Sequence, residues 1–273
     1  MKKQLFLPVG SVAVGAVCFA LRLLQNKTGF ESSTGLPVPG NIPAIALLCL
    51  LGLTGAVLFF RTRTQKNSLA FPADFSTQES ALLTLPVMGI LLLAVSGLLD
   101  AFAIARPGMI PLVETSSSPS SQLLFGVSAI AASAALFYAV SACREHTEAD
   151  SKQGFSEKEL APGISSRHLL LAVPACLVVR LVLSYRIHSV NPSLEAYYVE
   201  LLALVVLTLA FFRLASCSVQ PTPAGPLAWY SAISVILCLT VMADPLTLSA
   251  RLLYVGCCLT LLGFLILQNR PAQ

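Results

Sequence analysis

Eight apolar stretches separated by short polar segments restrict the folds open to this chain. All but the short fifth stretch are about 17 to 24 residues long, the length with which a helix crosses the hydrocarbon core of a bilayer. In hydrocarbon every backbone N–H and C=O must be bonded within the chain, so spanning elements are helices or closed barrels. Barrel strands are alternating segments of about ten residues, which these stretches do not resemble. They run over Leu5–Leu24, Ile42–Phe60, Ala81–Ile104, Leu123–Cys143, Leu169–Leu183, Tyr197–Leu214, Leu227–Ala243 and Leu248–Leu267.

The composition agrees with a bilayer as the solvent. Only 11% of the 273 residues are charged and 56% are hydrophobic, whereas soluble domains carry about 25% charged residues. A chain this apolar could not cover a water-facing surface of its size. We therefore predict an all-α, polytopic transmembrane bundle of about eight spans, whose main partner is the lipid bilayer.

The distribution of basic residues predicts the orientation. With the N-terminus in the cytoplasm, that side receives eleven of the 17 Lys and Arg residues and the outer side receives six. Lys and Arg are enriched in cytoplasmic loops, so we expect a multi-pass protein of the cell membrane with both termini inside. This bias also accounts for the net charge of +4 without a nucleic-acid partner. The inner set is Lys2, Lys3, Arg61, Arg63, Lys66, Arg144, Lys152, Lys158, Arg167, Arg213 and Arg270.

The longest polar segment divides the chain into two sets of four spans. We assign residues 1–146 to a first half, 147–166 to a cytoplasmic linker and 167–273 to a second half. The halves share weak similarities, such as LFFR at Leu58–Arg61 and AFFR at Ala210–Arg213. An even number of spans per half would make them parallel repeats, an arrangement found in some transporters. Chance similarity is the alternative.

The N-terminal segment and the cysteines each have a simple structural interpretation. The N-terminus resembles a secretory signal, but its apolar run ends at Arg22 without a small-residue cleavage site, and we expect a retained first helix. The eight cysteines lie inside or at the ends of apolar stretches, and no two of them form a CxxC motif. Buried cysteine behaves as a small hydrophobe, which favours packing over redox or metal chemistry.

Charged residues near the ends of the apolar stretches are the candidates for a binding site. On the predicted topology they all lie toward the outer half or outer face. Ionisable groups at membrane depth are costly and mark functional sites or paired helices. An arginine near the interface can also extend its guanidinium to the lipid phosphates. The candidate substrate-binding residues are Arg22, Asp100, Arg106, Arg180, Glu200, Asp244 and Arg251.

The two aspartates are expected to form ion pairs between helices. Arg106 follows Asp100 by six residues, whereas helical neighbours lie three or four residues apart. A partner on another helix is easier to reach, so we expect Asp100 to pair with Arg22 and Asp244 to pair with Arg180. Such pairs either fasten helix ends together or belong to a solute or ion site.

Glu200 is the most isolated of the acids. It lies beside Tyr197 and Tyr198, an aromatic pair typical of the membrane interface. We expect it to pair with Arg180 or Arg186 or to face a wet cavity, and a proton-carrying role is a third alternative.

The sequence contains no motif of a known catalytic site. HExxH, a glycine-rich phosphate loop and GxSxG are absent, so we predict no catalytic residues, metal ligands or cofactor and regard an enzyme as less favoured. Our leading hypothesis is a small permease-like transporter with an Arg/Asp-lined site toward the outer face. The alternative is a membrane scaffold, sensory or regulatory subunit whose charges only hold helices together.

Overall fold

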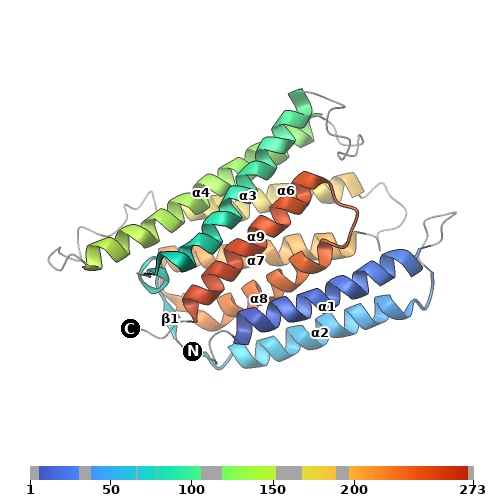
Figure 1. The fold of residues 1–273 in the computed structure, drawn as a ribbon, viewed down its shortest axis with the longest axis horizontal. Coiled ribbons are helices and arrows are strands. Elements are labelled where there is room, and N and C mark those ends of the chain that lie inside the picture. The colour runs from blue at the N-terminus through green and yellow to red at the C-terminus, as the bar shows by residue number, and fades with distance from the viewer. Residues whose placement is uncertain are drawn as a thin grey trace.

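The structure, a computed structural model, is a bundle of long helices (Figure 1). It describes residues 6–30, 38–65, 67–77, 79–105, 119–151, 168–188 and 197–269. Within these ranges eight helices are long and apolar enough to cross a membrane, which confirms the predicted fold class. The helices are α1 (Phe6–Thr28), α2 (Ile42–Thr62), α3 (Ser80–Ala105), α4 (Pro119–Ser151), α6 (Ala172–His188), α7 (Tyr198–Val219), α8 (Ala224–Val241) and α9 (Leu248–Gln268).

The helix boundaries agree with the apolar stretches to within a few residues, with one informative extension. α4 continues to Ser151, well past Cys143 at the end of its apolar stretch. The first residues of the segment that we assign to the linker are therefore helical, and residues 152–167 lie outside the described ranges.

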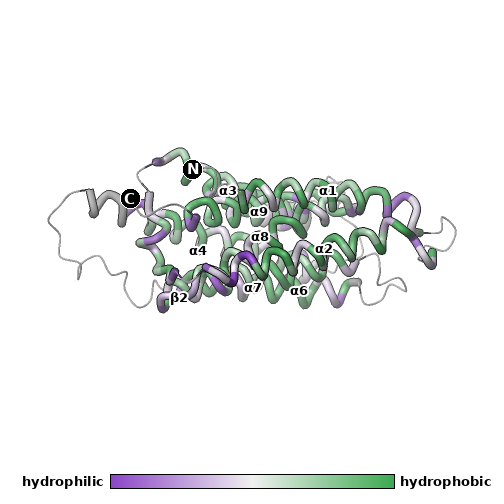
Figure 2. Tube along the Cα trace, turned by 90° about the horizontal axis from the view of Figure 1, so that it is seen from below, coloured by the Kyte–Doolittle hydropathy of each residue, from purple (hydrophilic) through white to green (hydrophobic). Residues whose placement is uncertain are grey.

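Hydropathy along the chain follows the layout expected of a membrane bundle. Figure 2 shows hydrophilic residues mainly toward the two ends of the bundle and hydrophobic residues along the helices between them. α2 is the helix with the least buried span, only 6% of it being enclosed by the rest of the chain. Its side chains Ile42, Leu53 and Phe60 are 66 to 78% exposed, so this helix presents its apolar surface to lipid.

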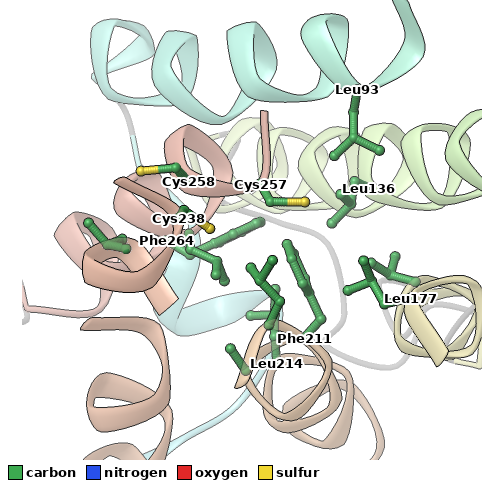
Figure 3. Packing of buried hydrophobic residues seen from close by; sticks show 14 of the residues in the cluster. Leu93, Leu136, Leu177, Phe211, Leu214, Cys238, Cys257, Cys258 and Phe264 are labelled. Carbon is green, nitrogen blue, oxygen red and sulfur yellow. The ribbon is translucent and has the colours of Figure 1, made fainter. Parts of the chain in front are cut away.

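α8 and α9 form the centre of the bundle. Their spans are 72% and 67% enclosed, more than those of the other spans. α8 packs against α1, α2, α7 and α9, and α9 packs along α3. The core that these helices share contains Phe211, Leu214 and Phe264 together with the buried thiols of Cys238 and Cys257 (Figure 3).

Glycines allow α3 to approach its neighbours closely. A methyl group placed on Gly97 would lie 2.8 Å from the carbonyl oxygen of Gly126 on α4, and one on Gly256 of α9 would lie 2.7 Å from the carbonyl oxygen of Gly89. Small residues at helix contacts are typical of membrane proteins, because association there relies on close packing.

A short two-stranded sheet joins two parts of the chain at the end of the bundle where α1 begins and α9 ends. Strand β1 (Ser68–Leu69) follows α2 and pairs antiparallel with strand β2 (Thr222–Pro223), which follows α7. The 3-10 turn η1 (Ala73–Phe75) places Phe75 against Phe264 of α9, with ring centroids 5.7 Å apart. Side chains from both predicted halves therefore close this end together.

The two predicted halves do not pack as separate units. α3 lies along α9, α1 lies along α8, and α4 contacts α6, so each half supplies neighbours to the other. The division into halves and the repeat remain predictions from the sequence.

We expect Gly97→Ala to lower the stability of the protein by about 1–3 kcal/mol, because its methyl group would force α3 and α4 apart. Thermal unfolding in detergent measures this loss. Gly52→Ala is the matched control, since no atom lies within 4 Å of a methyl group added there. Equal melting temperatures for the two variants would contradict the close crossing of α3 and α4.

Candidate functional site

The predicted charges that lie within the described residues gather at one end of the bundle, which we call the charged end. Arg22 and Asp100 lie near the ends of α1 and α3, and Glu200 lies in the first turn of α7. Successive helices run in opposite directions, so the ends of α1, α3, α6 and α8 lie beside the starts of α7 and α9. The sheet of β1 and β2 lies at the opposite end.

The structure corrects the predicted ion pairs, because the two aspartates have exchanged partners. Arg22 pairs with Asp244, and Arg180 pairs with Asp100. The prediction was wrong because it placed each arginine beside an aspartate of its own half. α1 instead packs on α8, which carries Arg22 to the residues that follow α8, and α4 holds α6 near α3.

Arg22 and Asp244 form a tight hydrogen-bonded pair. The Arg22 Nε donates to Asp244 Oδ1 at 2.7 Å, and Asn26 Nδ2 donates to the same oxygen at 3.0 Å. The Arg22 side chain is fully buried, its Nη1 donates to Gln25 Oε1, and its guanidinium lies 5.3 Å from the Tyr198 ring centroid. These contacts hold the end of α1 against the segment that follows α8.

Opposing influences act on the pKa of the Asp244 carboxyl. Burial raises the pKa of its carboxyl above the ordinary value. The hydrogen bond and positive charge of Arg22 and the hydrogen bond from Asn26 lower this pKa, whereas the negative charge of Glu200 raises it. Asp244 Oδ2 is buried and has no hydrogen bond within the described part of the chain. Glu200 is therefore electrostatically coupled to this pair.

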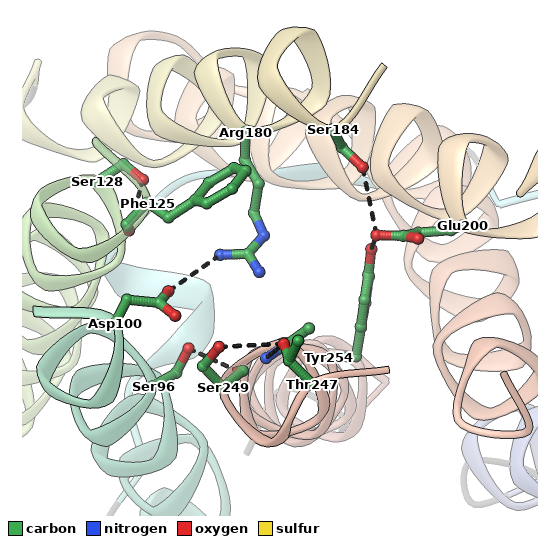
Figure 4. Close-up of polar contacts among 11 residues, drawn as sticks. Ser96, Asp100, Phe125, Ser128, Arg180, Ser184, Glu200, Thr247, Ser249 and Tyr254 are labelled. Atoms are coloured by element: carbon green, nitrogen blue, oxygen red, sulfur yellow. Dashed lines mark hydrogen bonds and ion pairs between the residues drawn. The ribbon is translucent and has the colours of Figure 1, made fainter. Parts of the chain in front are cut away.

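Arg180 and Asp100 form a looser pair. Arg180 Nη1 lies 3.8 Å from Asp100 Oδ2, and the side chains are only 8% and 10% exposed. This distance is longer than a hydrogen bond, and among the described residues neither atom has a hydrogen-bond partner. The Phe125 ring of α4 lies 4.7 Å from the guanidinium carbon. A buried donor and a buried acceptor thus face each other across a gap (Figure 4).

Glu200 lies on the far side of Arg180 in the same view. Its Oε1 accepts hydrogen bonds from Tyr254 at 3.2 Å and from Ser184 at 3.4 Å (Figure 4). Glu200 is half-buried, whereas Tyr254 is fully buried. We call Arg180, Asp100, Glu200, Ser184 and Tyr254 the Arg180 cluster.

Hydroxyl groups at the start of α9 border the Arg180 cluster. Ser96 of α3 donates to the Ser249 carbonyl oxygen at 2.8 Å, and the Ser249 and Thr247 hydroxyls lie 3.2 Å apart. Thr247 also caps α9 by accepting a hydrogen bond from the backbone N–H of Ala250. The hydrogen bond from Ser96 therefore holds the start of α9 against α3, below the Arg180 cluster in Figure 4.

Helical spacing explains how these polar residues share one face, and it also indicates how they could have been found. Ser96 precedes Asp100 by four residues and Ser184 follows Arg180 by four, and residues four apart lie on the same side of a helix. Ser96, Ser184 and Tyr254 are not among the candidate residues predicted from the sequence. The spacing was a readable signal for both serines, whereas the charged residue at helical spacing from Tyr254 is Arg251, three residues earlier and exposed.

The two remaining candidate residues are Arg251 and Arg106. Arg251 lies in the first turn of α9 with an exposed side chain. Arg106 lies outside the described residues.

The Arg180 cluster brings guanidinium, carboxylate and hydroxyl groups together. Among the described residues, no group of three His, Cys, Asp or Glu side chains is placed to hold a metal ion. All eight cysteines are free thiols, most of them buried. The chain matches no protein-family model, no curated protein and no solved structure with which it was compared.

We expect Asp244→Asn to lower the stability by about 3–5 kcal/mol, because it leaves the Arg22 guanidinium buried without its anion. Chemical unfolding in detergent measures the change. The double variant Arg22→Met/Asp244→Leu should recover most of the loss, since it removes both buried charges together. An Asp244→Asn protein that unfolds like the wild type would show that this pair does not anchor α1.

Proposed function

We propose that this integral membrane protein is a small permease-like carrier that binds a small solute or ion at the Arg180 cluster. The gap between Arg180 Nη1 and Asp100 Oδ2 is the observation that supports this proposal most directly. Both atoms are buried, both belong to ionisable groups, and neither is hydrogen-bonded to a described residue. Charges retained inside a membrane bundle at such cost commonly serve a substrate or ion pathway.

The Arg22–Asp244 pair supplies the contrast. There a guanidinium nitrogen and a carboxylate oxygen are in direct contact at 2.7 Å, and Asn26 adds a second bond. The same two residue types are therefore bonded in one place and held apart in the other. A pair that only fastens helices gains most from direct contact, so the separation at Arg180 favours a binding role.

The depth of the cluster also suits a carrier. Arg180 precedes the end of α6 at His188 by eight residues, or about 12 Å along a helix. Glu200 is in the first turn of α7 and is half-buried. A solute arriving from water at the charged end would meet Glu200 before Arg180 and Asp100.

The scaffold alternative retains one observation in its favour. The Arg22–Asp244 pair has the geometry of a structural contact, and Arg180–Asp100 would be a second such contact in which a water molecule bridges the gap. Under that reading the cluster binds no solute.

The proposal includes an orientation, with both termini in the cytoplasm and the charged end outside the cell membrane. A fluorescent protein fused after Gln273 should then fluoresce, and alkaline phosphatase inserted between α3 and α4 should be active. These reporters work on opposite sides of the membrane. The reverse pair of results would place the charged end in the cytoplasm.

Uptake into vesicles tests the carrier directly. Vesicles containing the purified protein are offered radiolabelled rubidium, acetate, methylammonium, glycine and glucose. At least one solute should enter faster than into protein-free vesicles, and Asp100→Asn should slow that uptake by about tenfold or more, as expected for loss of one ionic contact.

Two controls separate binding from folding. Glu145→Gln removes a carboxylate from an exposed position on α4 and should leave uptake unchanged. The melting temperature of Asp100→Asn shows whether the variant is folded. If folded wild-type protein transports no solute of the panel, the carrier proposal fails and the scaffold reading is favoured.

A further inference from the structure

We infer that the Arg180 cluster selects a small zwitterion that carries a carboxylate and a primary ammonium group, as a small α-amino acid does. This inference rests on the proposed function and names the chemical class of its solute. It follows from which atoms of the cluster lack hydrogen bonds and from where the charges lie.

The two atoms without hydrogen bonds need opposite partners. Arg180 Nη1 is a donor and requires an acceptor, and Asp100 Oδ2 is an acceptor and requires a donor. A simple cation would satisfy Asp100 and meet the positive charge of Arg180, and a simple anion would do the reverse. A zwitterion supplies one group to each, because a carboxylate accepts from a guanidinium and an ammonium donates to a carboxylate.

The position of Glu200, the second carboxylate of the cluster, indicates on which side the ammonium group of the solute would lie. Glu200 lies on the other side of Arg180 from Asp100, where Tyr254 and Ser184 hold its Oε1 (Figure 4). Two carboxylates, those of Asp100 and Glu200, therefore lie on either side of the Arg180 guanidinium. This arrangement favours a solute that carries a cationic group as well as a carboxylate.

The surroundings of the cluster restrict the size of the solute. Arg180 and Asp100 are only 3.8 Å apart, and Phe125 covers one face of the guanidinium. The start of α9 lies below the pair and carries the hydroxyls of Ser249 and Thr247. A solute that bridges the pair must present its two charged groups close together, as on adjacent atoms of one small molecule, and have a small side chain.

Equilibrium binding to the purified protein tests this specificity. Radiolabelled glycine is the probe, and alanine, acetate and methylammonium are the competitors. Glycine should bind saturably and alanine should displace it. Acetate and methylammonium should each compete at least about tenfold more weakly, because each satisfies only one of the two charges.

Variants identify the groups that hold each end of the probe. Arg180→Gln and Glu200→Gln should each weaken glycine binding by at least about tenfold, the size of one lost ionic contact. Arg63→Gln and Glu145→Gln make the same two substitutions at exposed positions of the opposite end and should bind as the wild type does. Melting temperatures of all four variants report whether they are folded.

Each outcome decides a different claim. If glycine does not bind, or if acetate or methylammonium competes as well as alanine does, the zwitterion inference fails. If vesicles then still take up another solute in a manner that depends on Asp100, the carrier proposal stands without it. If no solute of the panel is bound or carried, both fail, as expected for a pair bridged by water alone.

Discussion

An ionised side chain inside a membrane bundle needs an opposite charge within reach, and this need governs the charged end of the protein. Arg22 ties α1 to the segment after α8 through Asp244, and Arg180 ties α6 to α3 through Asp100. Breaking a buried pair leaves a charge without compensation, which costs more than the pair itself contributes. The end of α1 is therefore linked to the end of α8, and the end of α6 is linked to the end of α3.

The two pairs have the same chemistry and different geometry. Arg22 and Asp244 are in hydrogen-bond contact and their carboxylate has a second donor in Asn26. Arg180 and Asp100 stand farther apart, between an aromatic ring and a row of hydroxyls. A pair already in direct contact has less to gain from a solute than a pair held apart, and this difference is the basis of the carrier proposal.

The opposite end of the bundle is built from other interactions. There the pairing of β1 with β2 and the packing of Phe75 on Phe264 join segments from both parts of the chain. Closely packed glycines link α3 to α4 and to α9 between the two ends. The close packing of α3 on α4 reaches the charged end, since a methyl group placed on Gly126 would lie 3.5 Å from the Asp100 Cβ.

The sequence by itself determined the fold class, the helix boundaries and the end of the bundle at which the charges gather, because the length and polarity of a stretch set how deep each residue lies in a bilayer. It also indicated Ser96 and Ser184 through their spacing from Asp100 and Arg180. Which helix lies beside which depends on side-chain packing between distant parts of the chain. Only the tertiary structure could therefore give Arg22 to Asp244 and Arg180 to Asp100, bring Tyr254 to Glu200, and leave Arg251 exposed.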